Sequence, residues 1–117
     1  MDEQERVSEF LTAHGMESPL PYRVLDLESE VGELAKEVTT STKYGASPAN
    51  AAVAGDEIGD ALFALLAVAD AAEVDAGHAL DEAIAKYESR IETTGDAGSD
   101  ADSDGTDSDS DGTGGGD

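Results

Sequence analysis

Apolar residues recur at helical spacing in four stretches of the chain. The clearest stripe has members three or four residues apart: Val24, Leu27, Val31, Leu34 and Val38. Similar spacings occur near both ends of the folded part, at Val7, Phe10 and Leu11 and at Leu80, Ile84, Tyr87 and Ile91. Residues spaced in this way fall on one face of an α-helix. No stretch shows the alternation of a strand bounded by turn residues. The pattern therefore predicts an all-α fold.

Proline and glycine set the expected limits of these helices. Gly15 stops the first helix, and Gly45 ends the second. Ser18-Pro19 and Ser47-Pro48 each resemble an N-cap followed by proline at the first helical position. Asp75 is expected to cap the last helix. The helices are expected at about residues 2–14, 19–44, 48–72 and 76–94. Because the connections are short, the economical architecture is an antiparallel four-helix bundle.

The third helix also indicates how the chain assembles. From Ala61 to Ala69 its sequence is Ala-Leu-Phe-Ala-Leu-Leu-Ala-Val-Ala, so no face is polar. A helix that is apolar all round must be covered all round, whereas a small bundle normally leaves one side of each helix to water. We therefore expect a homo-oligomer, either a homodimer or a homotetramer. The alternative is a monomer with a modest apolar patch.

The composition changes abruptly near residue 95. The segment from Gly95 to Asp117 holds 8 Asp, 7 Gly, 4 Ser, 2 Thr and 2 Ala, and it has no large apolar residue. Such a segment cannot bury enough surface to offset its ordering entropy. The sequence therefore predicts a helical domain over residues 1–94 and a disordered, acidic C-terminal tail over residues 95–117.

The charge of the chain excludes several classes of partner. There are 28 acidic and 6 basic residues, and the net charge is −22. A protein that grips nucleic acid or an anionic membrane without sequence specificity needs a basic surface, so neither partner is expected. The absence of cysteine excludes a disulfide framework and a thiolate zinc site.

The same acidic, lysine-poor surface suggests a halophilic protein, since high internal salt screens self-repulsion. The alternative is a very soluble acidic protein from any cytoplasm. The longest apolar run, Ala61–Ala69, is too short to span a bilayer. Residues 1–5 lack the basic and apolar regions of a signal peptide, so a cytoplasmic location is expected.

Two pairs of carboxylates are the strongest candidates for chemistry. Glu30 and Glu33 are three residues apart in the second helix, and Glu57 and Asp60 are three apart in the third. A three-residue step brings two side chains onto one helix face, so antiparallel packing can bring all four together. Two carboxylates about 4 Å apart repel by roughly 4 kcal/mol at an effective dielectric constant near 20, and a divalent cation reverses that sign. All-oxygen ligands suit Mg²⁺ or Mn²⁺. A plain charged face is the alternative, because such pairs are common on solvated helices.

The surroundings of these pairs resemble a known family. Glu30-Val31-Gly32-Glu33-Leu34-Ala35, followed further along by Glu57-Ile58-Gly59-Asp60-Ala61-Leu62-Phe63, is similar to the motif of the MazG-like nucleoside triphosphate pyrophosphohydrolases. That motif is written E-E-x-x-E, a spacer, then E-x-x-D. The resemblance covers roughly residues 18–92 and includes the Lys-Tyr-x-x-Arg pattern that ends at Arg90. The chain departs from the motif at its first acid, where it has Ser29.

The resemblance implies an enzyme that hydrolyses a nucleoside triphosphate to the monophosphate and pyrophosphate. It implies a metal site formed by Glu30, Glu33, Glu57 and Asp60, with Glu30 or Glu33 orienting the attacking water. Lys86 and Arg90 in the fourth helix, and Lys43 in the loop after the second, are the candidates for contacts with the substrate's phosphates. The alternative is a non-catalytic helical module that binds a partner, in which Ser29 marks decay of the site.

Overall fold

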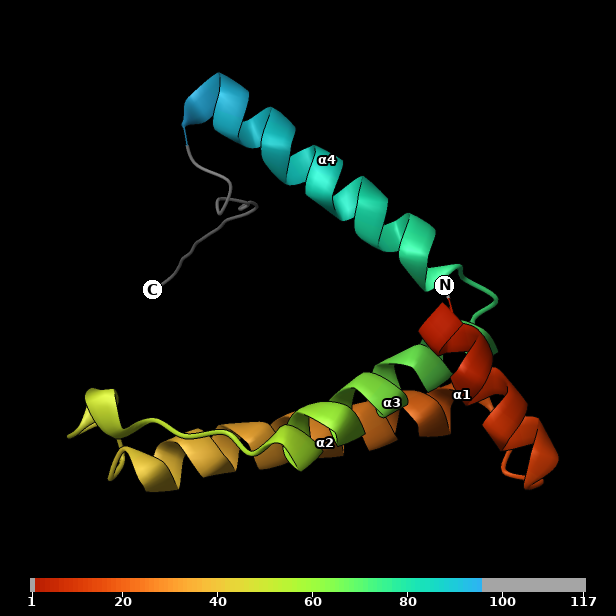
Figure 1. The fold of residues 1–117 in the computed structure, drawn as a ribbon, viewed down its shortest axis with the longest axis horizontal. Helices are drawn as coiled ribbons and strands as arrows, with labels where there is room; N and C mark the ends of the chain where they lie inside the picture. The colour runs from red at the N-terminus through yellow and green to blue at the C-terminus, as the bar shows by residue number, and fades with distance from the viewer. Residues whose placement is uncertain (1, 96–117) are drawn as a thin grey trace, which may run out of the picture. The chain divides into compact units, whose positions relative to one another are not determined.

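The computed structural model describes residues 2–95, and Figure 1 shows them as a ribbon. These residues form four α-helices and one 3-10 turn: α1 (Asp2–Ala13), α2 (Leu20–Ser41), η1 (Pro48–Asn50), α3 (Gly55–Ala71) and α4 (Ala76–Thr94). No strand occurs in this part of the chain. The predicted all-α fold is therefore confirmed. The predicted tail, beyond Gly95, lies outside the described residues.

The start of α3 differs from the prediction. Pro48 begins only the short turn η1, and Ser47 makes no side-chain capping hydrogen bond. The chain then runs to Ala54, whose backbone is extended and whose carbonyl accepts hydrogen bonds from the N–H groups of Glu57 and Ile58. Two acids in the first turn, Asp56 and Glu57, complement the positive end of the helix dipole. The third helix therefore begins at Gly55, seven residues later than Pro48.

The hydrophobic core of the first part of the chain lies between α1 and α3. Val7 and Leu11 of α1 are buried against Leu66 and Ala67 of α3. Phe63 packs beside this cluster, and its ring meets the ring of Phe10 edge to face at a centroid distance of 5.9 Å. Burial of these side chains supplies the main driving force for joining the two helices.

Helices α2 and α3 pack side by side in opposite directions (Figure 1). Arg23, near the start of α2, lines a cavity together with Ala67, near the end of α3. Two turns further along α2, Glu30 lies near Asp60, which is earlier in α3. Residue numbers thus rise on one helix as they fall on the other, as expected for antiparallel neighbours.

The face that α2 turns toward α3 contains only the two leucines of the apolar stripe that the sequence predicts. The half-buried or buried positions of α2 are Arg23, Leu27, Glu30, Leu34, Glu37 and Ser41. Val24, Val31 and Val38, by contrast, are exposed, Val31 by 50%. The helix is rotated relative to the expectation, so that Leu27 and Leu34 face α3 together with Glu30 and Glu37. Three valines consequently remain on the surface of α2.

The chain divides into two compact units, Met1–Gly77 and a second that begins at His78. Most of α4 belongs to the second unit, and we describe it by itself. Within α4, the Lys86 ammonium and the Arg90 guanidinium lie 5.0 and 5.9 Å from the centre of the Tyr87 ring. The place of α4 in an antiparallel four-helix bundle stays a prediction. Each helix within residues 2–95 is too short or too polar to cross a membrane.

Candidate metal centre

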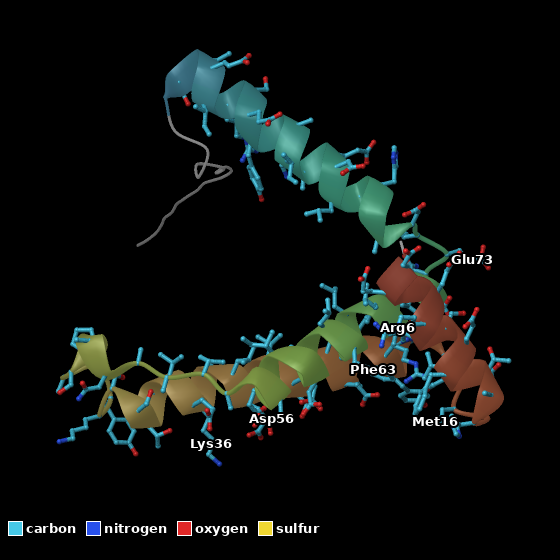
Figure 2. The ribbon with its side chains drawn as sticks, in the orientation of Figure 1. Arg6, Met16, Lys36, Asp56, Phe63 and Glu73 are labelled. Atoms are coloured by element: carbon cyan, nitrogen blue, oxygen red, sulfur yellow. The ribbon has the colours of Figure 1, made fainter. Side chains whose placement is uncertain are left out.

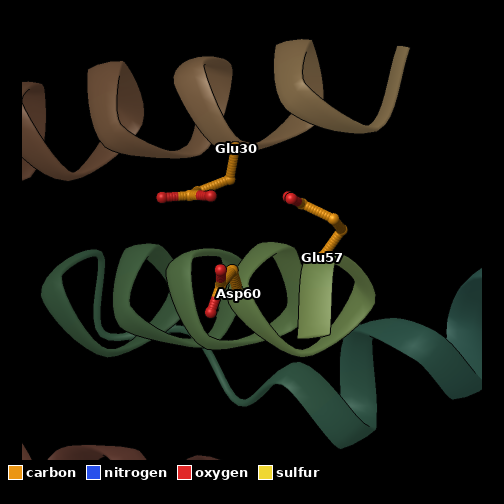
Figure 3. A group of neighbouring side chains, drawn as sticks. All are labelled: Glu30, Glu57 and Asp60. Carbon is orange, nitrogen blue, oxygen red and sulfur yellow. The ribbon is translucent and has the colours of Figure 1, made fainter. Parts of the chain in front are cut away.

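Three of the four predicted carboxylates come together between α2 and α3. Glu30 projects from α2, and Glu57 and Asp60 project from α3 toward it (Figure 3). One carboxylate oxygen from each residue lies within 4.8 Å of the other two. Glu30 and Glu57 are half-buried, and Asp60 is exposed. The antiparallel packing and the three-residue step from Glu57 to Asp60 together produce this arrangement.

Glu33, the fourth predicted ligand, lies one turn beyond Glu30 on α2 and outside this group of three. It is exposed, yet it is close enough to Glu57 for its charge to raise the pKa of that residue. Ser29, which replaces the first acid of the motif, is also exposed. Glu33 is therefore a neighbour of the cluster, and its role as a metal ligand stays a prediction.

Glu57 lies among several other negative charges. Desolvation raises the pKa of the Glu57 carboxyl above its ordinary value, and the charges of Asp56, Glu33, Glu37 and Asp60 raise it further. Each of these effects disfavours the ionised form of Glu57. A cation placed among the carboxylates would favour the ionised form instead. The electrostatic environment of Glu57 thus favours a bound cation.

The donor set of the cluster fits a hard divalent ion. All three groups are carboxylates, which Mg²⁺ and Mn²⁺ prefer to the nitrogen and sulfur ligands of zinc or copper. Oxygens bound to Mg²⁺ at about 2.1 Å lie roughly 3–4 Å apart, so the cluster needs only a small contraction to surround the ion. Three protein ligands leave the other positions of an octahedral ion to water or substrate.

The predicted phosphate-binding bases lie elsewhere in the chain. Lys43 has a φ of 53° in the turn that follows α2. Glu30 and Ser41, the last residue of α2, are eleven residues apart, or about 16 Å along the helix axis, and Lys43 follows Ser41. Lys86 and Arg90 belong to α4, where they flank Tyr87. Contact of these three bases with phosphate stays a prediction.

Arg23 is a residue that the sequence pattern did not single out. Its side chain is buried, with 8% of its surface exposed, and its guanidinium donates a hydrogen bond to the Met16 carbonyl. It lines a cavity of about 340 Å³ that also includes Glu30 and Asp60 of the carboxylate cluster. The only sequence signal was its position four residues before Leu27 on the buried face of α2. That signal was weak because the predicted stripe contains its neighbour Val24, which favours a different rotation of the helix.

Comparison with known proteins supports the resemblance seen in the motif. A family model described as the MazG nucleotide pyrophosphohydrolase domain matches residues 23–94. The match covers more than half of the chain and contains both acidic pairs. No curated protein and no solved structure matches the chain.

Proposed function

The chain belongs to the MazG nucleotide pyrophosphohydrolase family, and from that membership we propose that it hydrolyses a nucleoside triphosphate to the monophosphate and pyrophosphate with the help of Mg²⁺ or Mn²⁺. One observation carries the proposal. Glu30, Glu57 and Asp60, which belong to the family's two acidic pairs, lie within 4.8 Å of one another on neighbouring helices. Spacing along the sequence does not by itself require such convergence.

In this proposal the three clustered carboxylates hold the divalent cation. When bound, such an ion neutralises charge on the phosphates and lowers the pKa of a coordinated water. Glu33, which is close to Glu57 but outside the group of three, is free to accept a hydrogen bond from the attacking water. The water oxygen bonds to the α-phosphorus, the bond to the bridging anhydride oxygen breaks, and pyrophosphate leaves. The water's proton passes to a Glu33 carboxylate oxygen.

The substrate's negative charge must also be neutralised near a strongly acidic protein. We assign this role to Lys86 and Arg90 of α4, in addition to the cation. Lys43 is a weaker candidate within one chain, because it lies beyond the end of α2, more than about 16 Å along the helix axis from Glu30.

Product analysis tests the proposed reaction. We expect purified protein, incubated with Mg²⁺ and a panel of ribo- and deoxynucleoside triphosphates at low and high KCl, to release monophosphate and pyrophosphate in equal amounts. Ion-exchange chromatography separates these products from a diphosphate and orthophosphate. Release of orthophosphate would show that a different bond is cut. No release under any condition would favour the alternative of a non-catalytic, partner-binding module.

We further propose that the protein works as a homodimer or homotetramer. Val24, Val31 and Val38 of α2 are exposed, and so are Ile58, Leu62 and Leu65 of α3. These α3 residues have the i, i+4, i+7 spacing of one helix face, and a large exposed apolar patch is typical of an interface. We expect light scattering after size-exclusion chromatography to give a multiple of the chain mass of 12.0 kDa. A mass of one chain at micromolar concentration would overturn this expectation.

A further inference from the structure

A cavity next to the carboxylate cluster has the features of a site for the nucleoside part of a substrate. It has a volume of about 340 Å³ and lies between α2, α3 and the loop after α1. Glu30 and Asp60 form one part of its wall, and Arg23 and Asp26 form another. The cavity is therefore continuous with the cluster, and a ligand held there reaches the proposed cation.

The buried Arg23 guanidinium supplies hydrogen-bond donors to this cavity. A guanidinium carries five N–H donors, and the hydrogen bond to the Met16 carbonyl uses one of its nitrogen atoms. Within residues 2–95, no carboxylate lies within 4.0 Å of it to form an ion pair. Burying a charged donor without a full set of partners is costly. A ligand with acceptor atoms at this place would reduce that cost.

The charge of the cavity disfavours phosphate and favours an uncharged group. Its wall has one guanidinium, Arg23, and three carboxylates, Asp26, Glu30 and Asp60. With a divalent cation bound between Glu30 and Asp60, the phosphates are attracted to the ion at that end. Arg23 lies seven residues before Glu30, or about 10 Å along the axis of α2, which is comparable with the distance from the phosphates to the base of a nucleotide. The end of the cavity near Arg23 therefore suits the uncharged base of the nucleotide.

The remaining wall is apolar and suited to a flat ring. It is formed by Met16, Phe63, Ala64 and Ala67. Phe63, labelled with Met16 in Figure 2, is held by its edge-to-face contact with Phe10. The two alanines leave space beside it, because their side chains end at Cβ. Sites for small organic ligands combine apolar walls with a few polar groups that fix the orientation of the ligand.

From these features we propose that the cavity binds the nucleobase of the substrate, and that it selects a base with a carbonyl next to a ring N–H. Arg23 donates to the carbonyl oxygen, and Asp26 accepts from the N–H group. Guanine and uracil provide both groups, whereas adenine has no carbonyl. This inference rests on the proposed function, since it names the bases that the same site accepts.

Binding of neutral nucleosides to the metal-free, full-length protein tests the inference without relying on hydrolysis. NMR titrations at high KCl with guanosine, uridine and adenosine are expected to show binding of the first two, and binding of adenosine at least tenfold weaker. Asp26 is exposed, so Asp26→Ala is expected to fold normally and to weaken guanosine binding about tenfold, the usual cost of losing a hydrogen bond to a charged group. Glu9→Ala, which removes an exposed carboxylate of α1 outside the cavity, is the matched control and should bind like the wild type.

A second variant addresses Arg23 directly. Arg23→Lys keeps a positive charge and a donor for the Met16 carbonyl, but it loses the planar fork, so both guanosine and uridine should bind at least tenfold more weakly.

The inference is overturned if no nucleoside binds, if adenosine binds as tightly as guanosine, or if Asp26→Ala leaves every affinity unchanged. A protein that shows the expected nucleoside selectivity but cleaves no triphosphate would retain the base site and disprove the proposed function. A protein that cleaves triphosphates but binds all nucleosides alike would support the proposed function and disprove the base site.

Discussion

Glu57→Gln is expected to lower the rate of pyrophosphate release at least about 100-fold. Glu57 is one of three carboxylates whose oxygens lie within 4.8 Å of one another, and glutamine offers a neutral amide oxygen in place of a charged ligand. Even changes in groups that only support metal ligands typically cost 10–100-fold, and loss of a ligand itself should cost at least as much. The measurement is kcat and kcat/KM for the best triphosphate at saturating Mg²⁺, with circular dichroism to verify that the helices remain.

The adjacent residue provides the control. Asp56→Asn changes the charge by the same amount one position away, at the N-terminus of the same helix, and Asp56 is outside the group of three. Its side chain accepts a hydrogen bond from the Glu57 N–H at 3.0 Å, which the oxygen of asparagine can still accept. We expect its activity to stay within roughly threefold of wild type, as for a surface change of small energetic effect. Equal losses in both variants would mean that the local charge matters and that Glu57 is not a specific ligand.

Much of the fold could be predicted because its determinants are local. The recurrence of apolar residues every three or four positions depends only on the geometry of one helix, so the number and order of the helices followed from the sequence. Predicting that Glu30 lies near Glu57 and Asp60 needed one further assumption. Two helices joined by a connection of thirteen residues, 42–54, had to pack antiparallel. In the structure three of the four carboxylates lie close together, and their role as metal ligands stays a prediction.

The rotation of α2 could not be predicted in the same way. Periodicity shows that Val24, Val31 and Val38 share a face, but it does not say which neighbour covers that face. In the structure α2 turns Leu27 and Leu34 toward α3 and leaves these valines exposed. The start of α3 also differed from the prediction, because Ser47-Pro48 begins only the short 3-10 turn η1. Arg23 was missed for a related reason, since its burial depends on the loop that provides the Met16 carbonyl.

The stability of the protein is expected to depend on the divalent cation, and Glu57→Gln should remove most of that dependence. Desolvation and four neighbouring carboxylates raise the pKa of Glu57 in the folded protein. The ionised carboxylate therefore destabilises the folded state at pH values above the ordinary pKa, and the penalty disappears as the pH falls below it. Without metal at neutral pH, the neutral glutamine removes this penalty, so Glu57→Gln should melt at a higher temperature than the wild type.

With saturating Mg²⁺, the wild type should instead melt at a higher temperature than Glu57→Gln. A ligand at about 100 times its Kd stabilises the folded state by about 2.7 kcal/mol, and each kcal/mol raises the Tm of a domain of this size by roughly 4–8 °C. The wild type should therefore gain at least about 10 °C, whereas Glu57→Gln should gain little, because it lacks one of the three clustered carboxylates. Thermal melts followed by circular dichroism, with EDTA or Mg²⁺ at one constant ionic strength, separate ion binding from screening. If both proteins gain equally, the ion acts through general screening of the acidic surface, and the carboxylates between α2 and α3 form no specific site.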